Sequence, residues 1–301
     1  MSRSLKAHIL LVLATIVWGA TFVQIKNALA DISPLLFNAV RMTLAAAVLA
    51  AIYWKQITNI RGASLRAGVL VGLFLAVGYE FQTTGLKLTT PSKAGFLTGI
   101  SVVLVPVFLV LFWRRKIRAW TAAGVISAFA GLYLMTVPSG SASSWGGDFS
   151  SVNLGDLLTF ICAIAFAFQI ILLGRASRRH PFEQIAFLQT TTAAVVMLVL
   201  APVLEQPHVV WSSKVIWAIL VTGILGTAAA FTAQAWAQQF LPPTNAALIF
   251  SLEPVFAWLT SYVVLGERLG GRGALGAALI LAGVLVSELL GGTEESREPA
   301  G

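Results

Sequence analysis

The sequence predicts an all-α polytopic membrane protein with ten transmembrane helices arranged as two inverted five-helix repeats. Three observations predict this fold. Of the 301 residues, 57% are apolar and only 11% are charged, whereas roughly 25% are charged in a soluble domain. Ten apolar runs approach or exceed the length of about 18 residues that a bilayer crossing needs. Features of the first five runs recur in the second five.

The ten predicted helices follow one another with short connections, at about 7–26, 33–54, 66–86, 92–113, 119–137, 155–174, 182–203, 215–238, 243–265 and 272–290. The first run follows Arg3 and Lys6 and so resembles a signal peptide, but it is longer than a usual signal core and is interpreted as a retained helix. Pro242 and Pro243 divide a long uncharged stretch, because proline cannot continue a helix interior.

The chain is expected to contain two domains. Residues 7–137 form the first repeat and residues 154–290 the second; 138–153 is a Ser/Gly-rich linker and 291–301 a disordered tail. When the second half is shifted by 152 positions onto the first, equal residues coincide in order: Gln82 with Gln234, Pro91 with Pro243, Gly124 with Gly276 and Gly131 with Gly283. Because five is an odd number of crossings, the second repeat enters from the opposite side of the membrane.

Charge predicts the orientation. The chain carries 20 Lys and Arg against 12 Asp and Glu. With the N-terminus inside, thirteen of the basic residues are cytoplasmic and six are outside, so both termini are expected to lie in the cytoplasm. Because these residues occupy short membrane loops, no nucleic-acid partner is expected. The single cysteine, Cys162, excludes a disulfide framework, and no spacing typical of a metal site is present.

Several short motifs are similar to those of a known family. They are Trp18-Gly19, Arg41, Lys93-Ala94-Gly95-Phe96-Leu97, Glu253-Pro254-Val255-Phe256, Leu265-Gly266-Glu267-Arg268-Leu269 and the glycines from Gly276 to Gly283. In this order and spacing the chain resembles the EamA-like branch of the drug/metabolite transporter superfamily, from about Ile9 to Leu289. The resemblance implies a secondary transporter of the plasma membrane, often an exporter of amino acids or other small metabolites, without a bound cofactor. It does not identify the substrate.

Three ionisable residues, Arg41, Glu80 and Glu253, lie well inside predicted spans and away from their ends, where a charge costs roughly 2.5–3.5 kcal/mol. Arg41 and Glu80 fall at similar depth on consecutive helices, so they form either a buried ion pair or part of a site for substrate or a coupling proton. Glu253 lies near the midplane beside Pro254. It either attracts a cation, a proton or an amino group, or only satisfies neighbouring backbone groups.

Helix bends are expected at Pro106 and Pro254, because a proline removes one helical hydrogen bond. Under the repeat, these prolines belong to corresponding helices, the fourth and the ninth. The bends could serve either a binding site or packing alone.

Polar and aromatic residues that interrupt the apolar runs mark the expected cavity. The predicted substrate-binding residues are Trp18, Thr21, Gln24, Tyr79, Gln82, Gln169, Gln234 and Glu253. Amides offer donors and acceptors to a polar solute, although hydrogen bonds between helices are the alternative use. The aromatic rings would either contact solute or pack against neighbouring helices.

The sequence therefore favours a secondary transporter that moves a small amino acid-like or amphipathic solute, by export, through alternating access between the two halves. Helices 119–137 and 272–290 are expected at the periphery or in a homodimer interface. Two alternatives remain: a passive channel or non-transporting scaffold, and a membrane enzyme using Glu80 and Glu253 as paired carboxylates. The enzyme is disfavoured because neither a nucleophile nor a metal cluster accompanies the carboxylates.

Overall fold

The computed structural model describes residues 2–89, 91–136, 153–265 and 270–290. These residues fold into helices, and one isolated antiparallel β-bridge joins Ile32 and Val209. The prediction of an all-α fold is confirmed. The predicted linker 138–153, apart from its last residue, and the predicted tail 291–301 lie outside the described residues.

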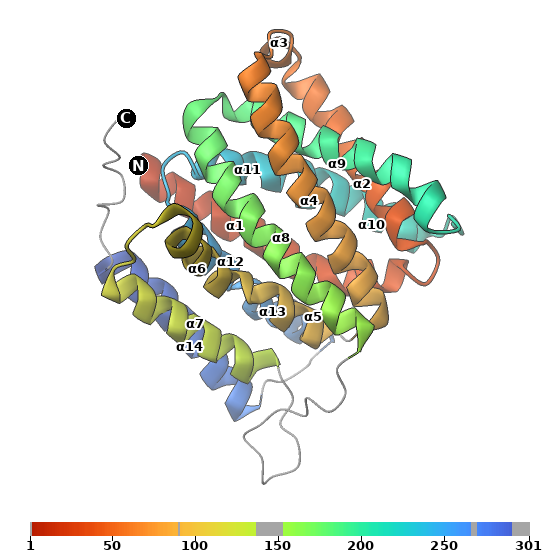
Figure 1. The fold of residues 1–301 in the computed structure, drawn as a ribbon. Coiled ribbons are helices and arrows are strands. Elements are labelled where there is room, and N and C mark those ends of the chain that lie inside the picture. The colour runs from red at the N-terminus through yellow and green to blue at the C-terminus, as the bar shows by residue number, and fades with distance from the viewer. Residues whose placement is uncertain (1, 90, 137–152, 266–269, 291–301) are drawn as a thin grey trace.

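The described residues of the first half form seven helical segments, which Figure 1 labels. They are α1 (Arg3–Ala28), α2 (Pro34–Ile52), α3 (Trp54–Ile57), α4 (Gly62–Leu88), α5 (Pro91–Gly99), α6 (Ser101–Trp113) and α7 (Ala119–Thr136). The local sequence explains why α1 and α2 begin where they do. The Ser2 hydroxyl accepts a hydrogen bond from the Leu5 amide, which satisfies an amide of the first turn. Pro34 occupies the first position of α2, where a missing N–H costs nothing.

In the second half, the part of the chain that the structure describes forms eight helical segments. They are α8 (Leu154–Arg179), α9 (Phe182–Leu204), α10 (Ser213–Gly223), the π-helix η2 (Ile224–Ala229), α11 (Ala230–Ala237), α12 (Pro243–Phe250), α13 (Glu253–Leu265) and α14 (Gly271–Leu290). Asn153 and Asp156 start α8 with a reciprocal capping box. The segments α10, η2 and α11 run on without a break, so the predicted helix 215–238 is one helix with a π-helical middle.

Eight helices in the described part of the chain are long and apolar enough to cross a membrane. Two of the ten predicted spans fall short. The helix Ala119–Met135 is apolar but shorter, and the predicted span 243–265 is divided into α12 and α13. The number of ten spans therefore stays a prediction.

Two interruptions divide corresponding helices. The first lies at Ile100, between α5 and α6, and the second at Ser251 and Leu252, between α12 and α13. Shifting Ile100 by the repeat offset of 152 places it on Leu252. Pro254 is the second residue of α13, where the new helix begins, whereas Pro106 lies inside α6, six residues after the interruption.

The helices α7 and α14 lie side by side at one edge of the bundle in Figure 1, which agrees with a peripheral position. A Cβ atom on Gly131 would lie 2.4 Å from the Gly276 carbonyl oxygen, and one on Gly124 would lie 2.5 Å from the Gly283 oxygen. The repeat offset of 152 relates Gly131 to Gly283 and Gly276 to Gly124. It therefore converts the first contact into the second. Such an exchange is the signature of a twofold relation, as the inverted repeat predicts.

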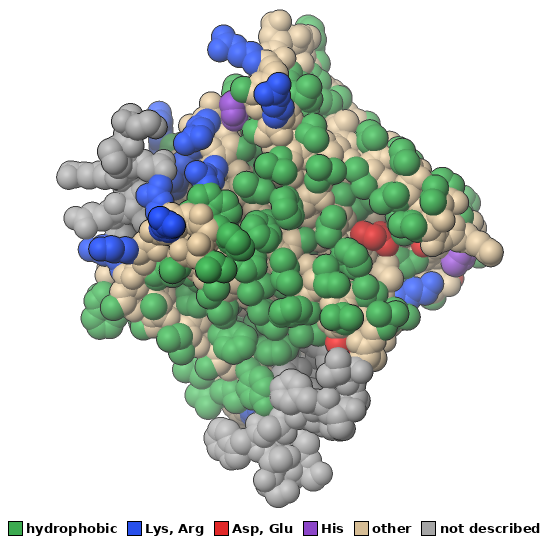
Figure 2. All heavy atoms as spheres, in the orientation of Figure 1, with side chains coloured by type: hydrophobic (Ala, Val, Ile, Leu, Met, Phe, Trp, Pro, Cys, Tyr) green, Lys and Arg blue, Asp and Glu red, His purple; other side chains and the backbone are tan. Residues whose placement is uncertain are grey.

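One end of the bundle is closed by apolar packing. Ala7 and Leu11 of α1 belong to a buried cluster with residues of α6, α8, α11 and α12, and His8 pairs with Glu288 of α14 at 2.7 Å. Figure 2 shows hydrophobic side chains over the middle of the visible face and Lys and Arg gathered toward the end that holds the N-terminus in Figure 1. An apolar belt with basic ends is typical of a multi-pass membrane protein.

Candidate functional site

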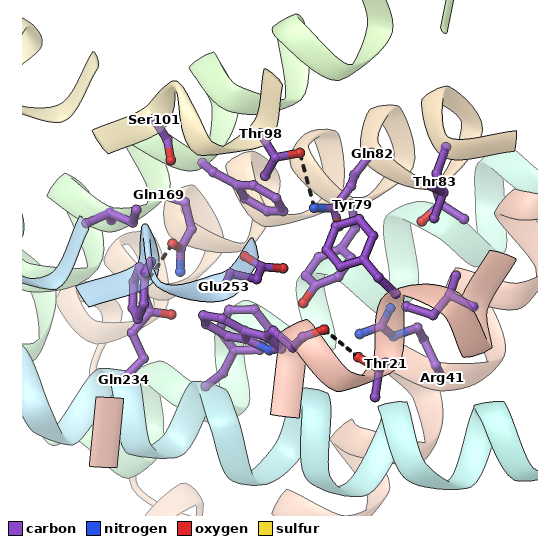
Figure 3. Close-up of a pocket in the computed structure, with 18 residues that line it drawn as sticks. Thr21, Arg41, Tyr79, Gln82, Thr83, Thr98, Ser101, Gln169, Gln234 and Glu253 are labelled. Atoms are coloured by element: carbon purple, nitrogen blue, oxygen red, sulfur yellow. Dashed lines mark hydrogen bonds between the residues drawn. The ribbon is translucent and has the colours of Figure 1, made fainter. Parts of the chain in front are cut away.

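A cavity of about 70 Å³ lies in the bundle, lined by residues of both halves. Side chains reach it from α1, α2, α4, α5 and α6 of the first half and from α8, α11, α12 and α13 of the second. Figure 3 shows these polar groups converging on one space from opposite sides. The interruptions of the two corresponding helices lie beside it, because α6 and α13 begin with residues that line it.

The cavity brings together most of the residues that the sequence singled out. Seven of the eight predicted substrate-binding residues line it, namely Trp18, Thr21, Tyr79, Gln82, Gln169, Gln234 and Glu253. Gln24 is not among its lining residues. The face of α1 that borders the cavity carries Trp18, Phe22 and Ile25, and with 3.6 residues per turn Gln24 is rotated away from that face.

Arg41 lines the cavity from α2 and is almost completely buried, with 1% of its surface exposed. Its Nη2 donates to the Thr227 hydroxyl at 3.1 Å, and the guanidinium lies over the Tyr79 ring, 4.5 Å from its centroid. The other two guanidinium nitrogens, Nε and Nη1, have no hydrogen-bond partner. A buried cation is thus held in place with donors left over for an acceptor.

Glu253 opens α13 and points into the middle of the cavity (Figure 3). The amides of Gln169 and Gln234 lie to one side of it, and Tyr79 and Arg41 to the other. No hydrogen bond or ion pair is found for its carboxylate in the described part of the chain. At this depth an unpaired carboxylate is costly, so the position is suited to a proton, a cation or a protonated amine.

The ion pair between Arg41 and Glu80, one of the two alternatives for these residues, is not formed. Glu80 accepts hydrogen bonds from the Asn38 amide at 3.3 Å and the Thr84 hydroxyl at 2.6 Å, and it does not line the cavity. Successive residues on a helix point about 100° apart. Since Tyr79 faces the cavity, its neighbour Glu80 is turned away.

The π-helix η2 explains how the wall near Arg41 is built. Inside it the Ala230 amide donates to the Leu225 carbonyl, one residue beyond the α-helical partner. The Gly226 carbonyl instead accepts a hydrogen bond from the Trp18 indole at 2.8 Å. The Thr227 hydroxyl donates to the Thr222 carbonyl at 2.8 Å and accepts from Arg41. The π-helix thereby fixes both Trp18 and Arg41 at the site, a common use of π-helical turns.

Amides line the side of the cavity opposite Arg41. Gln234 donates to the Gln169 side-chain oxygen at 3.4 Å, and Gln169 donates to Gln189 at 3.1 Å. The side-chain oxygen of Gln234 is buried without a partner and so can accept a hydrogen bond. Gln82 stands apart from this network and contacts the Thr98 hydroxyl at 3.5 Å.

Aromatic rings form the apolar wall. Tyr79 meets Phe166 and Phe231 edge to face, with centroids 5.4 and 5.8 Å apart, and Trp18 meets Phe231 and Phe250 at 5.6 and 5.1 Å. Such contacts fix the rings. The cavity is therefore an apolar pocket walled by packed rings, and it holds a cation, a carboxylate and one unpartnered amide oxygen.

Two polar residues of the cavity, Thr98 and Ser101, escaped the sequence analysis. Both lie in an otherwise apolar run, where a hydroxyl often bonds the preceding turn of its own helix. The repeat could have revealed Ser101, because the offset of 152 places it on Glu253. The interruption at Ile100, which the sequence did not suggest, turns Ser101 toward the cavity.

The chain is similar to proteins of one family along nearly its whole length. The model of the EamA-like transporter family matches residues 5–137 and 153–289. An "Uncharacterized transporter" of Archaeoglobus fulgidus is 32% identical, covering 95% of this chain and 87% of that protein. The "Uncharacterized transporter YoaV" of Bacillus subtilis is 23% identical, covering 91% and 93%. A solved structure, described as "Crystal structure of protein", has a TM-score of 0.76 and 21% identity, covering 99% of this chain and all of that one.

Proposed function

Since this chain belongs to the EamA-like transporter family, we propose that it is a secondary transporter that carries a small zwitterionic solute through the cavity between its two halves. The solute is an amino acid-like molecule with a carboxylate and a protonated amine. The names of the relatives also indicate a transporter rather than an enzyme.

One observation carries this proposal. One cavity holds both Arg41, with two unpartnered guanidinium nitrogens, and Glu253, whose carboxylate has no partner among the described residues. A solute carboxylate would bond to Arg41, because guanidinium donors match carboxylate oxygens. A solute ammonium group would pair with Glu253. Neither charge is then left alone at membrane depth.

The rest of the cavity suits the same solute. The unpartnered oxygen of Gln234 accepts one more hydrogen bond, and the rings of Trp18, Tyr79 and Phe231 surround an apolar side chain. A cavity of about 70 Å³ is small, so it favours a single small metabolite over a large amphipathic drug.

The proposed mechanism is alternating access, in which the two halves rock about the solute. The inverted relation of α7 and α14 supports it, since two inverted halves can adopt mirrored arrangements. We further propose a plasma-membrane location with both termini cytoplasmic, because thirteen of the 20 basic residues fall on that side. The proposed direction is export, which the family resemblance implies.

The test is counterflow in proteoliposomes, using a labelled amino acid chosen by a thermal-shift screen of all twenty. A transporter gives saturable uptake that an internal unlabelled pool stimulates. A channel equilibrates the label without stimulation, and that result would contradict the proposal.

The variant Arg41→Gln tests whether Arg41 binds the carboxylate end of the solute. The variant is expected to weaken binding of the chosen amino acid but to leave binding of its carboxyl amide unchanged, because the amide lacks the carboxylate. An equal loss for both compounds would show that Arg41 does not bind the carboxylate.

A further inference from the structure

A second cavity lies at the end of the bundle that holds the N-terminus, between α6, α8 and the start of α12. Its volume is about 170 Å³, and four arginines line it: Arg115, Arg175, Arg178 and Arg179. The described residues around it include no aspartate and no glutamate. The charged side chains among its described lining residues are therefore all basic.

Local geometry brings these arginines together from two elements. On α8, positions 175, 178 and 179 are three and four residues apart and share one helix face. Arg114 ends α6 in the left-handed conformation, with φ of 52°, and the next amide, that of Arg115, donates back to the Leu109 carbonyl at 3.0 Å. This turn returns the chain over the last turn of α6 and brings Arg115 to the cavity.

A simpler explanation accounts for only part of the cluster. Basic residues in the last turn of α8 balance the partial negative charge of that helix end. Arg115 comes from a different element, however, and the start of α12 adds a positive helix end, since Pro242 and Pro243 also line the cavity. The last turn of α8 alone therefore does not account for the basic side chains that line the cavity.

The second cavity is separate from the transport cavity. Leu109 and Ile171 line the second cavity and belong to the buried apolar cluster that closes this end of the bundle. Ile170, the neighbour of Ile171, lines the transport cavity instead. A layer of apolar side chains thus divides the two sites.

We propose that this arginine pocket binds a phosphate group. Phosphate matches the planar fork of guanidinium donors, and basic pockets between membrane helices bind phospholipid headgroups. Its apolar side favours a lipid source. Trp113 lines the pocket under Arg175, at 5.3 Å from ring centroid to guanidinium, and Leu111 and Phe112 before it on α6 are 64% and 56% exposed, where acyl chains can lie.

Thermal denaturation of the delipidated, purified protein tests this proposal. The added ligands are phosphatidylglycerol, phosphatidylcholine and inorganic phosphate, each titrated separately. Phosphatidylglycerol is expected to raise the melting temperature more than phosphatidylcholine does. Stabilisation by inorganic phosphate alone, at equal concentration, would identify a free anion as the source of the phosphate.

Arg178→Gln with Arg179→Gln is the decisive variant. The apparent affinity for the phosphate ligand is expected to fall on the order of 30-fold, at about fivefold for each guanidinium lost. The matched control is Arg61→Gln with Arg66→Gln, which removes the same charge from the same end of the bundle, where Ser64 contacts His180 after α8 at 3.2 Å.

Two outcomes would overturn the proposal. One is an equal loss of affinity in the control variant, which would show that the effect comes from net charge alone. The other is a wild-type protein on which neither phosphatidylglycerol nor phosphate acts more strongly than phosphatidylcholine. Arg178→Lys with Arg179→Lys keeps the positive charge and is expected to retain part of the affinity. It therefore separates loss of the ligand contacts from misfolding of the variant.

Discussion

The two halves of the molecule meet the transport cavity with the same backbone feature but with different chemistry. In the first half a helix is interrupted at Ile100 and resumes with Ser101. In the second half the corresponding helix is interrupted at Ser251 and Leu252 and resumes with Glu253. Ser101 and Glu253 are separated by the repeat offset of 152, and both line the cavity. One position offers a hydroxyl and the other a carboxylate.

This difference teaches which features the duplication preserves. The helix interruption and the close α7–α14 packing recur because backbone geometry depends on small residues and helix ends, which both halves keep. The charges do not recur: at the cavity, Arg41 comes from the first half and Glu253 from the second. A zwitterion needs opposite charges at its two ends, so a symmetric scaffold with unequal side chains suits it.

The largest expected effect comes from removing the carboxylate of the second half. Glu253→Gln is expected to weaken binding of the amino acid about 10- to 150-fold, because a charged hydrogen bond contributes roughly 1.5–3 kcal/mol. The matched change in the first half, Ser101→Ala, is expected to weaken it less than tenfold. Isothermal calorimetry or thermal-shift titration measures both.

Exchanging the two side chains tests whether the positions are equivalent. Glu253→Ser combined with Ser101→Glu keeps the composition of the cavity and is expected to bind the amino acid more tightly than Glu253→Ser alone. If Glu253→Gln leaves affinity unchanged but abolishes pH-driven transport, the residue carries a proton and not the amine.

The second prediction concerns the packing that both halves share. Gly131→Ala places a methyl group 2.4 Å from the Gly276 oxygen, and Gly283→Ala, at the position that the repeat relates to 131, places one 2.5 Å from the Gly124 oxygen. Each is expected to destabilise the protein by about 1–3 kcal/mol through overpacking, and by similar amounts. Gly62→Ala, with no atom within 4 Å of its added Cβ, is the control. Unequal losses at positions 131 and 283 would contradict the twofold relation.

Much of the fold could be predicted from the sequence, because bilayer length and proline positions determine where long helices begin and end. The interruption at Ile100 was not predicted although Gly99 directly precedes it, because glycine is common within membrane helices and Pro106 suggested a bend six residues later. The π-helix η2 was equally hidden. Its residues Ile224–Ala229 include Gly226, but glycine is common in membrane helices and does not by itself mark a π-helix; tertiary contacts with Trp18 and Arg41 accompany the altered register.

The sequence predicted which residues line the candidate site better than it predicted which of them contact one another. Polar residues inside apolar spans are costly, so Gln82, Gln169 and Gln234 could be singled out by depth alone. The depth of a residue in the membrane does not determine which way its side chain points around the helix axis. Arg41 and Glu80 were matched by depth, but their helices turn them toward different partners. Resolving that required the rotation of α2 and α4, which only the packed structure supplies.

The smallest expected effects are the losses of stability on replacing Gln234 and Gln82, the two glutamines that the repeat relates. Gln234 belongs to a buried network, so Gln234→Ala leaves the Gln169 side-chain oxygen without its donor and is expected to cost about 1 kcal/mol of stability. Gln82 makes one long contact of 3.5 Å with Thr98, and Gln82→Ala is expected to cost about 0.6 kcal/mol or less. Thermal denaturation without solute measures these losses. If Gln82→Ala proved the more destabilising change, the amide network would not be what holds this side of the cavity.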